Sequence, residues 1–359
     1  MTVVSCTERV VQVAPIVNNV DIRGEHVDIM SSDATKYTRW IVGNYAISED
    51  AMGKRCYYGG VIDNNKIGQF DTLFTVGHGH NEFDRIMLGN GQGNTLFLLN
   101  QPLCGNKLLS LTKIDASDRF ADVQNKNNWE KYDLSRLPPF SCGTDEMVPL
   151  TDSTLLVLGA PYDAIGHIFS VIDYKNQKVL PLQYWPNDGI DCDSCVKHNV
   201  YVFGARLLSN GKDRFLYQCD REKYSFIFSI EGSKINIINE LYGVYPDYKA
   251  AKDGHNFLQL NRTPENLYCT ANAKNIYILF KEYDKDGNKK EKWDSPLVYG
   301  DIVNVYDWDG NILNSFHLDR IGMRIMVSED NNKLYLFEDN YDENDLNIWL
   351  YDFAEQCEK

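Results

Sequence analysis

The sequence lacks long apolar runs and has almost no helical periodicity. No apolar stretch approaches the roughly 20 residues that a membrane-spanning helix needs, which excludes an integral membrane protein of that kind. No long window places apolar residues at i, i+3, i+4 and i+7 between good caps. The P-loop, Gly-x-Ser-x-Gly and His-Glu-x-x-His motifs are also missing, so no common catalytic motif is readable.

Basic residues are in the minority. The 359 residues include 36 lysines and arginines against 51 aspartates and glutamates, a net charge of −15. This balance argues against nucleic-acid binding, because an acidic protein repels phosphate. Apolar residues make up 43% of the chain, enough to fill a core, which excludes a disordered protein.

Short runs of β-branched and aromatic residues, separated by Asn, Asp and Gly, recur along the chain. Five continuous apolar runs, typical of strands buried on both faces, centre on Phe97, Leu156, Tyr201, Tyr277 and Tyr335, at intervals of 59, 45, 76 and 58 residues. A weaker copy centres on residues 40–45. Six copies near 60 residues predict an all-β, six-bladed β-propeller with four-stranded antiparallel blades.

The last copy ends before its fourth strand, so we expect an N-terminal strand to close the ring. Residues 10–13 or 20–22 are the two candidates for this strand. The predicted organisation is an N-terminal segment over residues 1–20 and a single propeller domain over residues 21–355.

Several motifs resemble a known family. The residues are Val305-Tyr-Asp-Trp-Asp-Gly-Asn311, Leu318-Asp319, Lys333-Leu-Tyr335 and the segment 74–83, in which His80 stands where the family's turn has proline. The chain resembles the TolB-like six-bladed propellers of Bacteroidetes, which are secreted or lipid-anchored, over residues 25–353. The resemblance implies the fold and very little about function.

The N-terminus contains a loose lipobox, Val3-Val-Ser-Cys6, without a basic region or a full apolar region before it. We interpret Cys6 as a candidate lipid attachment site, which the resemblance supports. The alternative is an ordinary strand with a chance cysteine. The expected location is the bacterial periplasm or outer surface, with membrane contact only through the lipid.

In a propeller the innermost strands line a central channel. Arg85, Arg206 and Arg324 lie near inner-strand positions, and His78 and His80 form a compact cluster with Glu82; these basic residues are the candidates for binding an anionic or sugar ligand. The histidine cluster would need further ligands from elsewhere to hold a metal. We therefore assign no metal and no cofactor, although a divalent cation stays open.

Two other groups have alternative interpretations. Cys192-Asp-Ser-Cys195 fits a zinc-binding pair, a redox pair or two thiols in a surface loop. Trp129, Trp185 and Trp293 are candidates for stacking on sugars or for packing within the blades.

We expect a monomeric, non-catalytic binding or scaffold propeller that engages a protein, peptide or glycan through its central funnel. The alternative is a propeller enzyme acting on a carbohydrate or lactone, with or without a metal. No catalytic residue is identified.

Overall fold

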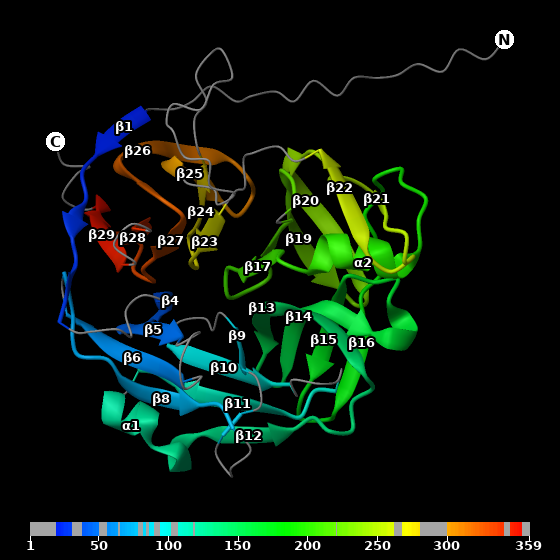
Figure 1. Cartoon of the computed structure of the whole chain (residues 1–359), viewed down its shortest axis with the longest axis horizontal. Coiled ribbons are helices and arrows are strands. Elements are labelled where there is room, and N and C mark those ends of the chain that lie inside the picture. The colour runs from blue at the N-terminus through cyan, green and yellow to red at the C-terminus, as the bar shows by residue number, and fades with distance from the viewer. Residues whose placement is uncertain are drawn as a thin grey trace.

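A computed structural model of the chain describes residues 19–30, 38–49, 56–63, 65–77, 82–83, 86–89, 94–101, 107–117, 119–219, 221–261, 268–280, 300–340 and 345–353. Over these residues six sheets surround a common centre (Figure 1), which confirms the six-bladed propeller. Neither helix within these ranges has the length and apolar character required to cross a bilayer.

The blades follow one another along the chain, and blades two to five are antiparallel meanders of four strands with the innermost strand first. The strands of blades two and three are β9 (Ile86–Gly89), β10 (Thr95–Asn100), β11 (Ser110–Asp115), β12 (Glu130–Asp133), β13 (Phe140–Thr151), β14 (Thr154–Pro161), β15 (Phe169–Asp173) and β16 (Lys178–Pro181). Those of blades four and five are β17 (Arg206–Ser209), β18 (Phe215–Gln218), β19 (Tyr224–Glu231), β20 (Lys234–Gly243), β23 (Tyr268–Ala271), β24 (Asn275–Phe280), β25 (Gly300–Asp307) and β26 (Ile312–Gly322).

Blades one and six meet where the ring closes. Blade one contains β4 (Thr38–Val42), β5 (Tyr45–Glu49), β6 (Cys56–Asp63) and β8 (Asp71–Thr75), and β7 (Lys66–Ile67) pairs with the end of β6. Blade six contains β27 (Arg324–Val327), β28 (Lys333–Asn340) and β29 (Asp345–Asp352). The inner strands β4 and β27 touch, because the Ile41 amide donates a hydrogen bond to the Met326 Sδ over 3.0 Å.

The second strand of a blade is the most buried, as its unbroken apolar sequence predicts. In β10, for example, residues Leu96 to Leu99 are all buried. The apolar clusters lie between adjacent blades, and the one between blades three and four is rich in aromatic rings such as Phe169, Tyr217 and Phe226. Each blade buries its faces only against its neighbours, so the ring forms as a unit.

One predicted strand is wrong. The run around Tyr201 belongs to helix α2 (Ser194–Val202), whose first turn is capped by the Asp193 side chain accepting from the Cys195 amide at 2.7 Å. The second strand of blade four is β18, with Tyr217 at the equivalent position. With Tyr217 in place of Tyr201, the repeat intervals become 59, 61, 60 and 58 residues. The two long and short intervals of the sequence therefore came from one misplaced strand.

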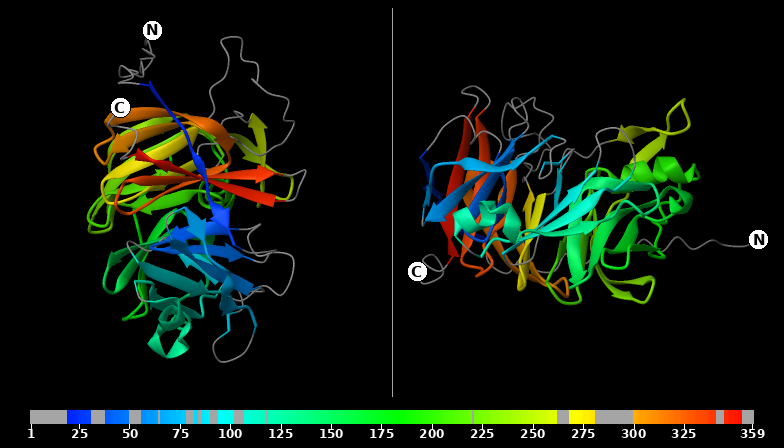
Figure 2. Two further views of the ribbon diagram at one scale, coloured as in Figure 1. Left: turned by 90° about the vertical axis from the view of Figure 1, so that its left-hand side faces the viewer. Right: turned by 90° about the horizontal axis from the view of Figure 1, so that it is seen from below.

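The N-terminal strand prediction is confirmed in kind and corrected in place. Residues 20–22 fall in β1 (Asn19–Ile22), which runs parallel to β26 of blade five and does not complete blade six. The fourth strand of blade six is β2 (Glu25–His26), which pairs antiparallel with β29. Next, β3 (Asp28–Ile29) pairs in parallel with β7 of blade one. Residues 19–29, here called the N-terminal strap, thus cross three blades (Figure 2). Residues 10–13 lie outside the described residues.

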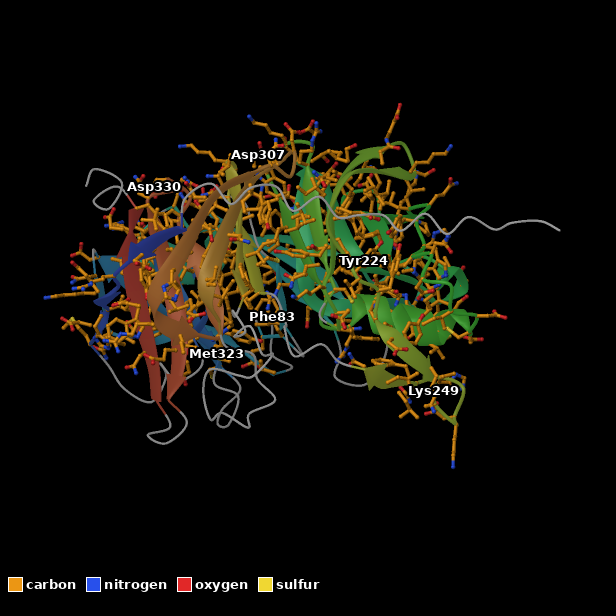
Figure 3. All side chains as sticks on the ribbon, turned by 90° about the horizontal axis from the view of Figure 1, so that it is seen from above. Phe83, Tyr224, Lys249, Asp307, Met323 and Asp330 are labelled. Carbon is orange, nitrogen blue, oxygen red and sulfur yellow. The ribbon has the colours of Figure 1, made fainter. Side chains whose placement is uncertain are left out.

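The two faces of the ring differ. Turns on one face are held by Asp and Asn side chains; the Asp307 Oδ1, for example, accepts from the amides of Asp309 (3.0 Å) and Asn311 (2.8 Å). Helix α2 and the hairpin β21 (Asp247–Ala250) and β22 (Phe257–Asn261) connect the outer strand of one blade to the inner strand of the next. Figure 3 shows Asp307 and Asp330 toward one face and Met323 and Lys249 toward the other. Helix α1 (Phe120–Gln124) joins β11 to β12.

Candidate functional site

The inner strands of three consecutive blades begin with a cationic or aromatic residue. Arg206 begins β17, Tyr268 begins β23 and Arg324 begins β27. Inner strands of a propeller run in the same direction around the centre, so these three residues lie at the same mouth of the ring. We call them the inner-strand rim.

Arg206 and Tyr268 form a stacked pair. The Arg206 guanidinium carbon lies 3.7 Å from the centroid of the Tyr268 ring, and both residues are partly exposed. Stacking on an aromatic face holds the guanidinium plane while its edges keep N–H groups for other partners. A guanidinium held in this way is suited to bind a carboxylate or adjacent sugar hydroxyls.

Arg324 reaches the rim through a close crossing of the backbone. Only Met323 separates the end of β26 at Gly322 from the start of β27, and the Met323 amide donates to the Phe337 carbonyl at 2.9 Å. A Cβ at Gly322 would lie 2.4 Å from the Leu336 side chain, so only glycine allows this approach. The Arg324 guanidinium lies 5.2 Å from the Phe337 ring centroid. Its position is therefore fixed by the passage from blade five to blade six.

Two insertions lead directly into the Arg206–Tyr268 pair. Helix α2 ends three residues before Arg206, and the β21–β22 hairpin precedes Tyr268 along the chain. The two insertions are joined to each other, since the Asn199 side-chain amide on α2 donates to the His255 carbonyl in the hairpin at 3.0 Å. This side of the rim is thus built from elements that the other blades do not share within the described residues.

A buried carboxylate provides the main link between the insertions. The Asp188 side chain is fully buried, and its Oδ1 lies 2.6 Å from the Lys197 Nζ, whose side chain is only 9% exposed. The hydroxyls of Tyr201 and Tyr248 both donate to the Asp188 Oδ2, over 2.9 and 2.8 Å. Tyr201 and Lys197 lie on α2 and Tyr248 on β21. One carboxylate therefore holds the helix and the hairpin in a single arrangement.

The electrostatics of this cluster agree with an ionised Asp188. Burial alone would raise the pKa of Asp188, but the hydrogen bonds from Lys197, Tyr248 and Tyr201 outweigh it, so the pKa lies below its usual value. Burial, followed by the nearby Asp188 charge, raises the pKa of Tyr201, and the same two causes raise that of Tyr248. Both phenols remain protonated donors at neutral pH, so the cluster serves as a structural clamp and not as an acid–base pair.

His198 on α2 is a buried neutral imidazole. Its Nδ1 lies 3.2 Å from the His167 carbonyl, which can only accept, so Nδ1 carries the proton and Nε2 accepts from the Ser141 hydroxyl at 3.1 Å. The ring is fully buried, and this burial lowers the pKa of His198 to about 4. The imidazole therefore packs the helix onto blade three.

This depressed pKa predicts a pH dependence of stability. An unfolded chain takes up the His198 proton below pH 6.5, while the folded protein resists protonation until about pH 4. Stability from this group is therefore present above pH 6.5 and lost as the pH falls to 4, by about 3 kcal/mol. Urea unfolding from pH 7 to 4 should show the wild type losing more stability than His198→Gln. Parallel curves would contradict it; carboxylates shared by both proteins cancel in the difference.

Most of the residues singled out from the sequence cannot be placed. His78, His80, Arg85 and Cys6 lie outside the described residues, as does Trp293. Arg85 directly precedes β9, so in sequence it takes the position in blade two that Arg206 and Arg324 take in theirs. Among the described residues no group of three or more His, Cys, Asp or Glu side chains is arranged to hold a metal.

Two tryptophans that were candidates for sugar stacking are packed instead. Trp129 is 7% exposed, contacts Phe74 and Phe83, and donates its Nε1 to the Val123 carbonyl at 2.8 Å. Trp185 lies beneath the Lys197 ammonium, 5.6 Å from it.

Sequence reasoning missed Tyr268 and the Asp188–Lys197 pair. Tyr268 carries no local signal beyond starting a short apolar strand. Asp188 sits in Pro186-Asn-Asp-Gly189, which resembles an ordinary polar turn. Their partners are distant in sequence, so only the fold brings them together.

Comparisons with known proteins find similar structures but no family. No family model matches the chain, and no curated protein matches it. A DUF4221 family member from Bacteroides vulgatus is a similar solved structure, with 12% identity, coverage of 93% of this chain and 92% of that one, and a TM-score of 0.46. The β-propeller domain of the Trilobed protease from Pyrococcus furiosus has 10% identity, coverage of 90% and 83%, and a TM-score of 0.41. A gluconolactonase from Xanthomonas campestris has 11% identity, coverage of 95% and 99%, and a TM-score of 0.43. Similarity at this level carries no information about ligand or activity.

Proposed function

We propose that this chain is a non-catalytic binding propeller of the bacterial cell envelope, which engages a protein, peptide or glycan ligand through its inner-strand rim. The observation that carries the proposal is the stacked Arg206–Tyr268 pair at the start of two adjacent inner strands. A guanidinium with its plane held on a ring and its edges accessible favours a ligand with carboxylates or paired hydroxyls.

The build of the rim supports binding over catalysis. The titratable groups of the adjoining clamp are held in single protonation states at neutral pH, Asp188 as the carboxylate and Tyr201 and Tyr248 as phenols. General acid–base chemistry favours groups with a pKa near the working pH. The clamp instead gives a preorganised surface, which lowers the entropy lost when a ligand binds.

The finer placement of the chain is also a proposal. We infer that it belongs with the TolB-like propellers of Bacteroidetes, since the motif Val305–Asn311 that carries the resemblance forms the end of β25 and the turn into β26. We further propose a monomer in the periplasm or at the outer surface, anchored by a lipid on Cys6 of the lipobox-like Val3-Val-Ser-Cys6. An in-frame upstream start encoding a basic and then an apolar stretch would support the anchor, and a stop codon just before Met1 would exclude it.

Ligand binding is tested with two arrays, one of glycans that includes uronic acids and one of peptides rich in acidic residues. The wild-type protein should bind carboxylate-bearing members, and Arg206→Ala should weaken that binding about tenfold or more, as expected for the loss of a charge-assisted hydrogen bond. Tyr268→Leu, which keeps the charge but removes the ring beneath it, should have a smaller effect in the same direction.

The matched control is Arg119→Ala, which removes the same charge from a side chain that is 88% exposed and far along the chain from the rim. Its binding should equal that of the wild type. Equal loss in Arg119→Ala and Arg206→Ala would reduce the effect to net charge and contradict the proposal. Hydrolysis of a lactone or glycoside by the wild type, abolished in Arg206→Ala, would favour an enzyme.

A further inference from the structure

The structure places the Cys192-Asp-Ser-Cys195 motif at the beginning of a helix and not between strands, as its sequence setting suggested. Asp193 is the N-cap of the nine-residue helix α2, Cys195 lies in its first turn and Cys192 immediately precedes the cap. Both cysteines are free thiols and both are partly exposed, whereas Cys56, Cys219 and Cys269 are buried. The motif is thus a solvent-accessible pair of thiols, distinct from the cysteines of the core.

The spacing of the pair suits a disulfide. Side chains three residues apart at a helix start lie on one face, with Cβ atoms about 5–6 Å apart. Disulfides form where the Cα atoms are roughly 4.4–6.8 Å apart, so a small adjustment at the open end of the helix is enough. The helix N-terminus also favours a thiolate over a thiol, because its amide groups carry partial positive charge.

We propose that Cys192 and Cys195 form a redox-active dithiol site that exchanges with small disulfides and closes a reversible intramolecular disulfide. The inference stands apart from the proposed ligand binding at the rim.

The two thiols have different environments, which sets the order of the exchange. Burial and the hydrogen bond and charge of Asp193 raise the pKa of Cys195, so Cys195 keeps its proton longer. The Cys192 sulfur, 3.9 Å from the Tyr248 hydroxyl oxygen, precedes the helix and is the attacking group.

The exchange is balanced with glutathione disulfide as the oxidant. The Cys192 thiolate attacks one sulfur of the glutathione disulfide, the S–S bond breaks, and one glutathione leaves and takes up a proton. Cys195 then loses its proton and attacks the Cys192 sulfur of the mixed disulfide, which expels the second glutathione. The two protein thiols are oxidised, and one disulfide is reduced to two thiols.

The test uses the full chain, reduced and then equilibrated in a series of glutathione and glutathione disulfide mixtures. After acid quenching, N-ethylmaleimide labels the remaining thiols, and mass spectrometry quantifies the peptide that contains both cysteines. We expect this peptide to lose both labels together as a linked pair, in proportion to the ratio of glutathione disulfide to the square of glutathione.

Variants separate the roles of the two sulfurs. Cys195→Ser should stop at a glutathione mixed disulfide on Cys192, while Cys192→Ser should form such an adduct on Cys195 about tenfold more slowly. Ser194→Ala, which changes the residue between them without removing a thiol, should behave as the wild type. Retention of both labels across the series, independent loss of the two labels, or linkage of either cysteine to a third cysteine would overturn the proposal.

Discussion

Asp188→Asn is expected to lower the free energy of unfolding by about 3–5 kcal/mol, the usual cost of removing one partner of a buried ion pair. The replacement keeps the shape of the side chain but leaves the Lys197 ammonium, 9% exposed and 2.6 Å from the carboxylate, without a counter-charge. It also weakens the acceptor shared by the Tyr201 and Tyr248 hydroxyls. Urea unfolding followed by intrinsic fluorescence measures the loss.

A matched substitution separates burial from ion pairing as such. Asp213 and Arg214 also approach to 2.6 Å, but the Asp213 side chain is 67% exposed. Asp213→Asn should therefore cost no more than about 1 kcal/mol. In the double variant Asp188→Asn/Lys197→Met, the uncompensated charge is gone, so its loss should be smaller than that of Asp188→Asn alone. Equal effects of the two single variants would refute the clamp.

Val27→Asp is expected to lower the free energy of unfolding by about 4 kcal/mol, because it buries a carboxylate without a partner. Val27 is fully buried in the N-terminal strap, between β2 and β3. It packs in one cluster with Ala46 of blade one and with Phe337 and Ile348 of blade six. The substitution therefore acts at the point where the two ends of the ring join.

The control for this prediction is Glu25→Ala, on an exposed side chain of the same strap, which should change stability by no more than about 0.5 kcal/mol. Hydrogen exchange gives a local readout, since the Val27 amide donates to the Ile348 carbonyl at 2.8 Å. That amide should exchange faster in Val27→Asp than in Glu25→Ala. Unchanged stability and exchange in Val27→Asp would mean that the strap does not hold the ring closed.

The repeat was readable because each blade needs the same local pattern. A strand covered on both faces must be apolar along its whole length, and Phe97, Leu156, Tyr277 and Tyr335 all fall in second strands of blades. The run at Tyr201 has the same composition but is helical, since Asp193 caps it and both sides of it are buried against neighbouring elements. Composition alone does not distinguish a buried helix from a buried strand.

The candidate site was readable only in part. Arg206 and Arg324 could be assigned to inner-strand positions because they precede short apolar runs. That Arg206 stacks on Tyr268, and that Asp188 receives one lysine and two tyrosines, could not be inferred. These partners are up to 62 residues apart, from Arg206 to Tyr268, and nothing in a local pattern encodes such a distance.

The sequence by itself determined the all-β class, the six blades and the need for an N-terminal strand, because burial on both faces and tight polar turns leave local signatures. The tertiary structure decided which N-terminal residues close the ring, where the Cys192–Cys195 pair lies and which side chains surround Arg206. These features depend on contacts between blades, and such contacts exist only once distant strands are brought together around a common centre.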